Sequence, residues 1–136
     1  VDKALDQMRY IVTDEEYKRV KKVKRKEREK LFYQFWEDRD PSSGTVVNEL
    51  MDQYYYRVSY TNEHFSSFLP GWKTDMGMIY ILFGPPDDTQ RSFSTNSRNT
   101  YETWYYYTIN RNFGFYDENG FGDYKLTTPY YRGVGW

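Results

Sequence analysis

The chain has 136 residues, 21% of them aromatic, no cysteine and a formal net charge of −1. This length suits one domain with its own core, and the lack of cysteine excludes disulfides, thiolate metal sites and a cysteine nucleophile. No apolar run reaches the roughly 18 residues of a membrane span, and residues 1–12 lack the basic-then-apolar layout of a secretory signal. The charge is uneven, because residues 18–30 hold nine Lys or Arg against two Glu.

Two amphipathic helices are predicted first. Thr13 and Glu16 match a capping box, so a helix is expected to begin there. With no Gly or Pro before Pro41, this helix is predicted to run to about residue 38. Apolar residues recurring at helical spacing predict a second helix at about 46–65, capped by Thr45. The short connection predicts an antiparallel helical hairpin.

The hydrophobic pattern changes after Gly71. Residues 78–83 (MIYILF) form a continuous apolar run that predicts a strand buried on both faces, ended by a Gly-Pro-Pro turn. The polar stretch 88–100 is expected to be a loop. The remaining strands are predicted at 101–108, 112–116 and 124–126, joined by tight turns. The expected fold is therefore α+β, a helical hairpin followed by an antiparallel meander of three or four strands. Residues 13–126 are expected to form one domain, with an extension or linker at 1–12 and an aromatic, glycine-containing tail at 127–136.

The stretch Gly71-Trp72-Lys73-Thr74-Asp75 resembles the GWxTD domain family, an uncharacterised domain of bacterial cell-envelope and secreted proteins, especially in the Bacteroidota. Further matches follow in the family's order: Phe35-Trp36, Arg39-Asp40-Pro41, Asn48-Glu49, Arg57-Val58, residues 77–83, Gly84-Pro85-Pro86-Asp87, and Glu102, Trp104 and Tyr106. The resemblance covers about residues 13–126. It implies a periplasmic, outer-membrane-associated or secreted protein with further domains upstream, and it supplies no catalytic residue.

A weaker likeness is to the small BamE-like outer-membrane lipoproteins. In that family paired helices precede an antiparallel sheet, and a Gly-x-Pro turn precedes a Trp-x-Tyr strand. The likeness points toward protein assembly rather than catalysis.

The GWKTD stretch has two interpretations. In the favoured, structural one, Thr74 and Asp75 fold back on the backbone of Met76 and Gly77, Gly77 takes a conformation closed to other residues, and Trp72 plugs the core. In the functional one, Trp72 stacks on a ligand and Asp75 binds it.

The turn between the two predicted helices is also given a structural interpretation in preference to a functional one. Asn48 is expected to hold the loop backbone beside Asp40, and Arg39 to reach a carboxylate. If Asp75 or Asp87 lies near Arg39, the motifs form one site.

Catalytic and metal motifs are weak. His64, the sole histidine, suits a surface or capping role, and a triad of Ser92 or Ser94 with His64 and Asp75 lacks the Gly-x-Ser-x-Gly elbow.

Two acidic stretches also favour structural interpretations. Adjacent Asp87 and Asp88 are expected to diverge rather than form a glycosidase pair. Residues 117–123 resemble a calcium-binding loop but lack its final bidentate Glu, so a hairpin turn is expected instead. No cofactor and no metal are predicted.

Two surfaces are predicted to dock partners. The first is a basic helix face made of Lys18, Lys21, Lys22, Lys24, Arg25 and Arg28, for which a simply solvated face is the default interpretation. Its expected partners are an acidic protein, a neighbouring acidic domain or anionic lipid headgroups.

The second surface lies on the 101–107 strand, where Glu102, Trp104 and Tyr106 point to one side and the alternate residues to the other. One side covers the helices and the other leaves an aromatic patch for a partner domain, the tail or a glycan. Nucleic acid is not expected, because the chain is slightly acidic and carries no recognition motif.

The sequence thus favours a non-enzymatic interaction module of a larger protein. The alternative is a ligand- or glycan-binding or hydrolytic site around Trp72, Asp75, Arg39 and Asp87. The distinction is whether these four side chains converge on an open pocket or are buried and bonded. The candidate binding residues are Trp72, Thr74, Asp75, Arg39, Asp40, Asn48, Asp87, Trp104 and Tyr106.

Overall fold

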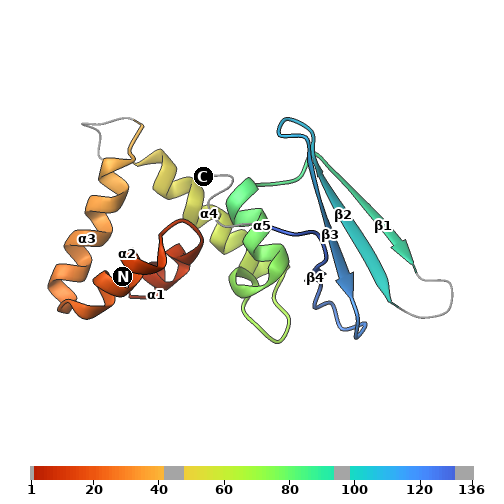
Figure 1. Cartoon of the computed structure of the whole chain (residues 1–136), viewed down its shortest axis with the longest axis horizontal. Coiled ribbons are helices and arrows are strands. Elements are labelled where there is room, and N and C mark those ends of the chain that lie inside the picture. Colours follow the sequence, from red (N-terminus) through yellow and green to blue (C-terminus); the bar gives the residue numbers. More distant parts are fainter. Residues whose placement is uncertain (1, 42–47, 94–98, 131–136) are drawn as a thin grey trace. The chain divides into compact units, whose positions relative to one another are not determined.

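The computed structural model describes residues 2–41, 48–93 and 99–130 of the chain (Figure 1). In chain order the elements are α1 (Asp2–Asp6), the 3₁₀ helix η1 (Gln7–Tyr10), α2 (Asp14–Lys22), α3 (Arg25–Asp38), α4 (Glu49–His64), the 3₁₀ helix η2 (Gly71–Lys73), α5 (Asp75–Phe83), β1 (Asp88–Phe93), β2 (Thr100–Tyr106), β3 (Arg111–Asp117) and β4 (Lys125–Leu126). Helices precede an antiparallel sheet, which confirms the predicted α+β class. Thr45 and Ser94, singled out above, lie outside the described residues.

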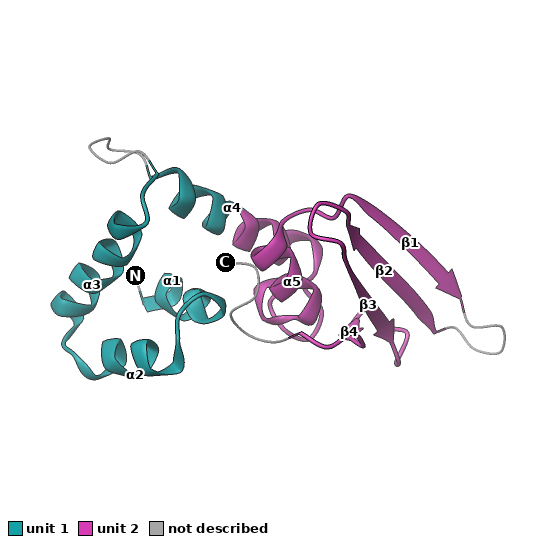
Figure 2. Cartoon of the chain, turned by 45° about the horizontal axis from the view of Figure 1, so that its top comes forward, with its two compact units in different colours: residues 1–56 teal, residues 57–136 magenta. Residues whose placement is uncertain are grey.

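Two compact units divide the chain, residues 1–56 and 57–136, and their boundary falls inside α4 (Figure 2). Among the described residues, no helix combines the length and the apolar character needed to cross a bilayer.

The long helix predicted from residue 13 to about 38 is wrong, because α2 and α3 are separate helices. The expected cap is present, with the Glu16 N–H donating to Thr13 Oγ1 at 3.1 Å. Val23 and Lys24 are extended, with ψ of 165° and 157°, and they interrupt the helix. Arg28 stabilises the break, since its Nε donates to Val23 O and its Nη2 to Lys21 O, both at 3.1 Å. A side chain of the next helix therefore caps α2 where no Gly or Pro marks an end.

The core of unit 1 is built from α3, α4 and the N-terminal segment. Phe32 and Trp36 of α3 are buried, and so is Tyr54 of α4. The Tyr54 hydroxyl donates to Gln7 O. Burial, followed by neighbouring tyrosines, raises the pKa of Tyr54 and keeps its hydroxyl a donor. Residues 1–12, expected as an extension or linker, include α1 and η1 and contribute the buried side chains of Leu5, Met8 and Val12.

Asn48 joins α3 to the start of α4. Its Oδ1 accepts the Met51 N–H at 3.0 Å, which caps α4, and its Nδ2 donates to Trp36 O at 2.5 Å. The helix predicted at about 46–65 corresponds to α4, and residues 46 and 47 lie outside the described residues.

The strand predicted at 78–83 is wrong, because this segment belongs to helix α5. Thr74 caps its start, accepting the Gly77 N–H at 3.0 Å. Gly84, at φ 81°, ends it with an N–H bond to Tyr80 O of 2.7 Å. The helix is apolar on nearly every side and is buried along most of its length. A continuous apolar run fits a buried helix as well as a buried strand, so its periodicity could not separate the two.

The sheet has the order β1-β2-β3-β4, with every neighbouring pair antiparallel (Figure 1). The strands predicted at 101–108, 112–116 and 124–126 correspond to β2, β3 and β4. The loop predicted from residue 88 is wrong over 88–93, which form the edge strand β1. All six of its residues are exposed, so the sequence carries no hydrophobic alternation there.

One face of the sheet packs on helices to form the core of unit 2. Ile79 and Tyr80 of α5 pack with Trp104, Phe113 and Phe115 of the sheet. The Tyr60 and Tyr80 rings stack, with centroids 4.4 Å apart, and join α4 to α5.

Candidate functional site

The first half of the GWKTD motif holds η2 against α4. Trp72 is 4% exposed, and its backbone N–H donates to Asn62 Oδ1 at 3.0 Å. Gly71 lies so close to α4 that a Cβ atom there would be 1.6 Å from Thr61 O. Only glycine permits this approach of two backbones.

The second half of the motif begins α5. The Thr74 hydroxyl donates to Gly71 O at 2.7 Å while it accepts the Gly77 N–H. Gly77 is helical, so the expected special conformation is wrong. Glycine is required there for space, because a Cβ atom would lie 1.9 Å from Gly71 O.

Asp75 makes a different contact from the one expected. Its Oδ2 accepts the Leu126 N–H at 2.8 Å and ties α5 to β4, while Thr74 rather than Asp75 accepts the Gly77 N–H. The motif therefore joins α4, α5 and the sheet through backbone contacts.

The other residues of the expected cluster serve separate turns. Arg39 lies in unit 1, where its Nη1 donates to Phe35 O at 3.2 Å and its guanidinium sits 3.7 Å above the Phe35 ring. Asp40 follows α3, its N–H donating to Glu37 O at 3.2 Å. In unit 2, Asp87 Oδ2 accepts the Tyr107 N–H at 2.7 Å. The carboxylates of Asp75 and Asp87 thus bind backbone groups in different places, in β4 and in the turn after β2.

A pocket that the sequence did not predict lies on the helix side of the sheet. Its volume is about 310 Å³. The walls come from the end of α4 at His64, the start of α5, strands β1 and β2, and the loop 121–124 before β4. All of these residues belong to unit 2.

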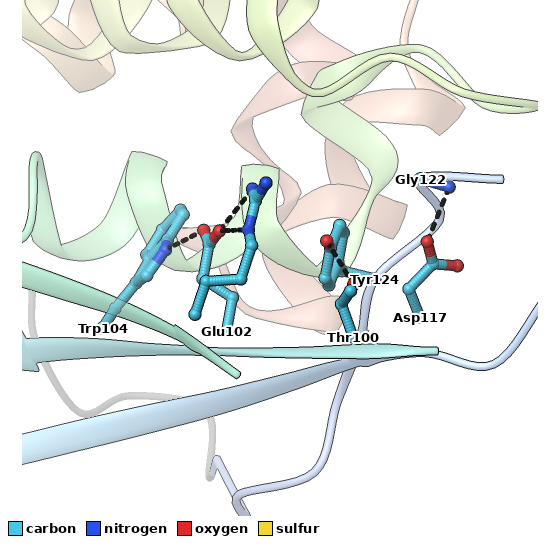
Figure 3. Close-up of polar contacts among 7 residues, drawn as sticks. Thr100, Glu102, Trp104, Asp117, Gly122 and Tyr124 are labelled. Atoms are coloured by element: carbon cyan, nitrogen blue, oxygen red, sulfur yellow. Dashed lines mark hydrogen bonds and ion pairs between the residues drawn. The ribbon is translucent and has the colours of Figure 1, made fainter. Parts of the chain in front are cut away.

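Glu102 is the centre of the hydrogen bonds in this pocket (Figure 3). Its Oε1 accepts Arg91 Nη2 at 2.7 Å and Arg91 Nε at 3.1 Å, and its Oε2 accepts Trp104 Nε1 at 2.7 Å. The Glu102 side chain is 13% exposed and that of Arg91 is 56% exposed. The hydrogen bonding that Arg91 donates to Glu102, followed by the negative charge of Glu102, raises the pKa of Arg91. The network fixes a carboxylate and a permanent cation side by side.

The loop at the mouth of the pocket is held by Asp117. This buried carboxylate accepts the Gly120 N–H at 3.1 Å and the Gly122 N–H at 2.8 Å, and Figure 3 shows the second bond. Its oxygens thus brace a turn. Among the described residues, no cluster of three or more His, Asp or Glu could hold a metal.

Register explains why the sequence missed this pocket. The sequence predicts a loop at Arg91, whereas the residue pairs directly with Glu102 across β1 and β2. Alternation did place Glu102 on the same side as Trp104 and Tyr106. Those last two, predicted as binding residues, are 2% and 5% exposed and belong to the core. The Tyr106 hydroxyl donates to Gly84 O at 2.8 Å.

The opposite face of the sheet is open and carries tyrosines, as the alternation predicts. Tyr101 and Tyr107 are 45% and 63% exposed. The Tyr101 and Tyr116 rings stack at 4.5 Å between centroids, and Tyr105 and Tyr107 lie in parallel at 6.2 Å. We call Tyr101, Tyr105, Tyr107 and Tyr116 the tyrosine face.

The predicted basic face separates into two groups. Lys21 Nζ pairs with Asp6 at 2.9 Å, and Arg28 caps α2 and lies 3.5 Å from Asp2. Although partial burial acts in the opposite direction, hydrogen bonds from Tyr17 and Lys21 lower the pKa of Asp6. The exposed remainder is Lys18, Lys22, Lys24 and Arg25. The first group is engaged in ion pairs and a helix cap, whereas no ion pair within the described residues holds the second.

The chain matches the model of one known protein family. The GWxTD domain matches residues 1–129. No curated protein matches the chain, and no solved structure does either. The likeness to BamE-like lipoproteins therefore stays an interpretation of the sequence. With nearly its whole length matched and the GWKTD motif built into its fold, this chain belongs to the GWxTD domain family.

Proposed function

We propose that this chain is a non-enzymatic protein-interaction module of a larger bacterial cell-envelope or secreted protein. The observation that carries the proposal is the tyrosine face. Tyrosines occupy the face of the sheet opposite the core, and none of them belongs to the core cluster formed by the described residues of unit 2.

The tyrosine face has the properties of a recognition surface. Tyrosine offers a large amphipathic contact area at a low cost in conformational entropy. The stacked pair of Tyr101 and Tyr116 restricts both rings before a partner arrives. We therefore expect a protein or a neighbouring domain of the same polypeptide to cover this face.

The basic group of Lys18, Lys22, Lys24 and Arg25 supports a second contact. These side chains are exposed on α2, on α3 and at the turn between them. A concentrated positive charge accelerates encounter with an acidic partner and is screened by salt. We propose that it steers an acidic protein surface, while the tyrosine face supplies the packed interface.

The alternative site around Trp72, Asp75, Arg39 and Asp87 has less support. Trp72 is 4% exposed, and both aspartates already accept backbone N–H groups.

Site-specific photo-crosslinking in the cells that produce the full-length protein tests the proposal. A photoreactive phenylalanine analogue is placed at Tyr105 or Tyr107, and at Tyr56 as a control with 69% exposure outside the face. We expect both positions on the face to crosslink to the same protein or domain and the control to fail to do so. Equal crosslinking at all three positions, or none on the face, would contradict the proposal.

A further inference from the structure

We propose that the pocket around Glu102 and Arg91 binds a neutral sugar residue. This site is on the helix side of the sheet, opposite the tyrosine face, so the inference is independent of the proposed interaction function. Its volume of about 310 Å³ falls at the lower end of the range for small-ligand pockets, roughly 300–1,000 Å³.

The charges in the pocket favour a neutral ligand. Arg91 is a cation, Glu102 and Asp123 are anions, and all three line the pocket. Glu102 is paired with Arg91, and Asp123 Oδ2 lies 3.4 Å from Lys125 Nζ. Neither an anion nor a cation would find an uncompensated opposite charge, so a ligand that both donates and accepts hydrogen bonds fits better.

The Glu102 network leaves hydrogen-bonding capacity for hydroxyl groups. A carboxylate has about four acceptor positions. Oε1 receives two N–H groups from Arg91 and Oε2 receives one from Trp104, so Oε2 retains an acceptor position among the described residues. The bonds from Arg91 use Nε and Nη2, which leaves the Nη1 donors for a ligand oxygen. Fixed acceptors beside fixed donors match vicinal hydroxyls.

Phe121 provides the apolar surface that a sugar ring needs. It lines the pocket although it is 72% exposed. Phe68, 76% exposed, meets it edge to face with centroids 6.2 Å apart. Asp117 braces the turn beneath Phe121 through Gly120 and Gly122. Phe121 on its braced turn, with the exposed Phe68 of the segment after α4 beside it, presents an apolar surface suited to binding, and the carbon face of a pyranose packs on such a ring.

The experiment is a titration of the full chain, observed through the four tryptophan indole N–H resonances by ¹⁵N NMR. The probes are methyl glycosides of glucose, galactose, mannose and N-acetylglucosamine, with inorganic phosphate in a parallel titration. Trp104 is the reporter, because its indole N–H donates to the Glu102 oxygen that retains capacity. We expect at least one glycoside to shift the Trp104 resonance in a saturable way while the indoles of Trp36 and Trp72 stay in place.

Matched variants locate the binding. Phe121→Ala removes the ring, and Phe93→Ala removes a phenylalanine of equal exposure, 72%, outside the pocket lining. Both side chains are exposed, so both variants are expected to fold. We expect Phe121→Ala to weaken the glycoside by about fivefold or more and Phe93→Ala to leave it unchanged. The proposal is overturned if no glycoside shifts Trp104, if both variants weaken binding equally, or if phosphate alone gives the shift. The crosslinking experiment reports on the tyrosine face and this titration on the Glu102 pocket, so a failure to crosslink at Tyr105 would not change the outcome of the titration.

Discussion

The Asp75 carboxylate, in the first turn of α5, accepts the backbone N–H of Leu126 in β4 at 2.8 Å. This bond joins residues 51 positions apart in the chain. It makes the aspartate of the GWKTD motif a link between a helix and the last strand.

Replacing Asp75 tests this structural role. We expect Asp75→Ala to lower the free energy of unfolding by about 1–3 kcal/mol, because it leaves a partly buried N–H without its acceptor. Asp75→Asn should cost less, since an amide oxygen can still accept. Chemical denaturation of both variants measures the difference. A folded Asp75→Ala protein of unchanged stability that has lost binding or turnover would show that the residue belongs to a functional site.

The second prediction concerns the direction of a glycine substitution. Gly→Ala inside a helix ordinarily stabilises by about 1 kcal/mol. At Gly77 we expect destabilisation of about 3 kcal/mol or more, because the added Cβ would lie 1.9 Å from Gly71 O. Thermal unfolding gives the sign directly, and a more stable Gly77→Ala protein would contradict the described packing.

The third prediction separates the two groups of basic residues. Changing Lys18, Lys22, Lys24 and Arg25 to Glu should leave the fold intact and weaken partner binding, most strongly at low salt. Arg28→Ala should instead destabilise unit 1, because Val23 O and Lys21 O lose their donor. Binding that is insensitive to both salt and the four reversals would remove the basic group from the interface.

The fourth prediction is a pH dependence at Asp6. Its pKa is lowered in the folded chain, so its ion pair with Lys21 and its bond from Tyr17 stabilise the fold above the ordinary aspartate pKa of about 3.9. That contribution is lost as the pH falls through the lowered value. Asp6→Asn should therefore reduce the stability at pH 7 and converge with the unchanged chain near pH 2. A stability difference that persists at pH 2 would assign the effect to packing instead.

Much of the fold could be predicted because local signals agreed with it. The capping residue Thr13, the alternation in β2 and the turn residues around Asn110, at φ 52°, act within a few positions. The errors arise where the local pattern fits more than one structure or where a side chain several residues away decides. The continuous apolar run at 78–83 fits a buried helix as well as a buried strand. The chain breaks at Val23, where Arg28, five residues further on, binds the freed carbonyls.

The candidate site was less predictable than the fold for a similar reason. Glu102 and Trp104 could be placed on one side of a strand by alternation. Arg91 meets them only through the register of β1, a polar edge strand without a hydrophobic pattern. Backbone partners such as Leu126 for Asp75 also require the tertiary structure.

The exposed position within the GWKTD motif explains how the motif can vary. Lys73 is exposed on η2, whereas Gly71, Trp72 and Thr74 are buried and Asp75 is bonded to β4. Substitutions at residue 73 should therefore be tolerated, and the other four positions are restricted by space or by a backbone partner. The family motif is then a set of residues required to join α4 and α5 to the sheet. Domains that share it can differ in what they bind, since neither the tyrosine face nor the Glu102 pocket uses its aspartate.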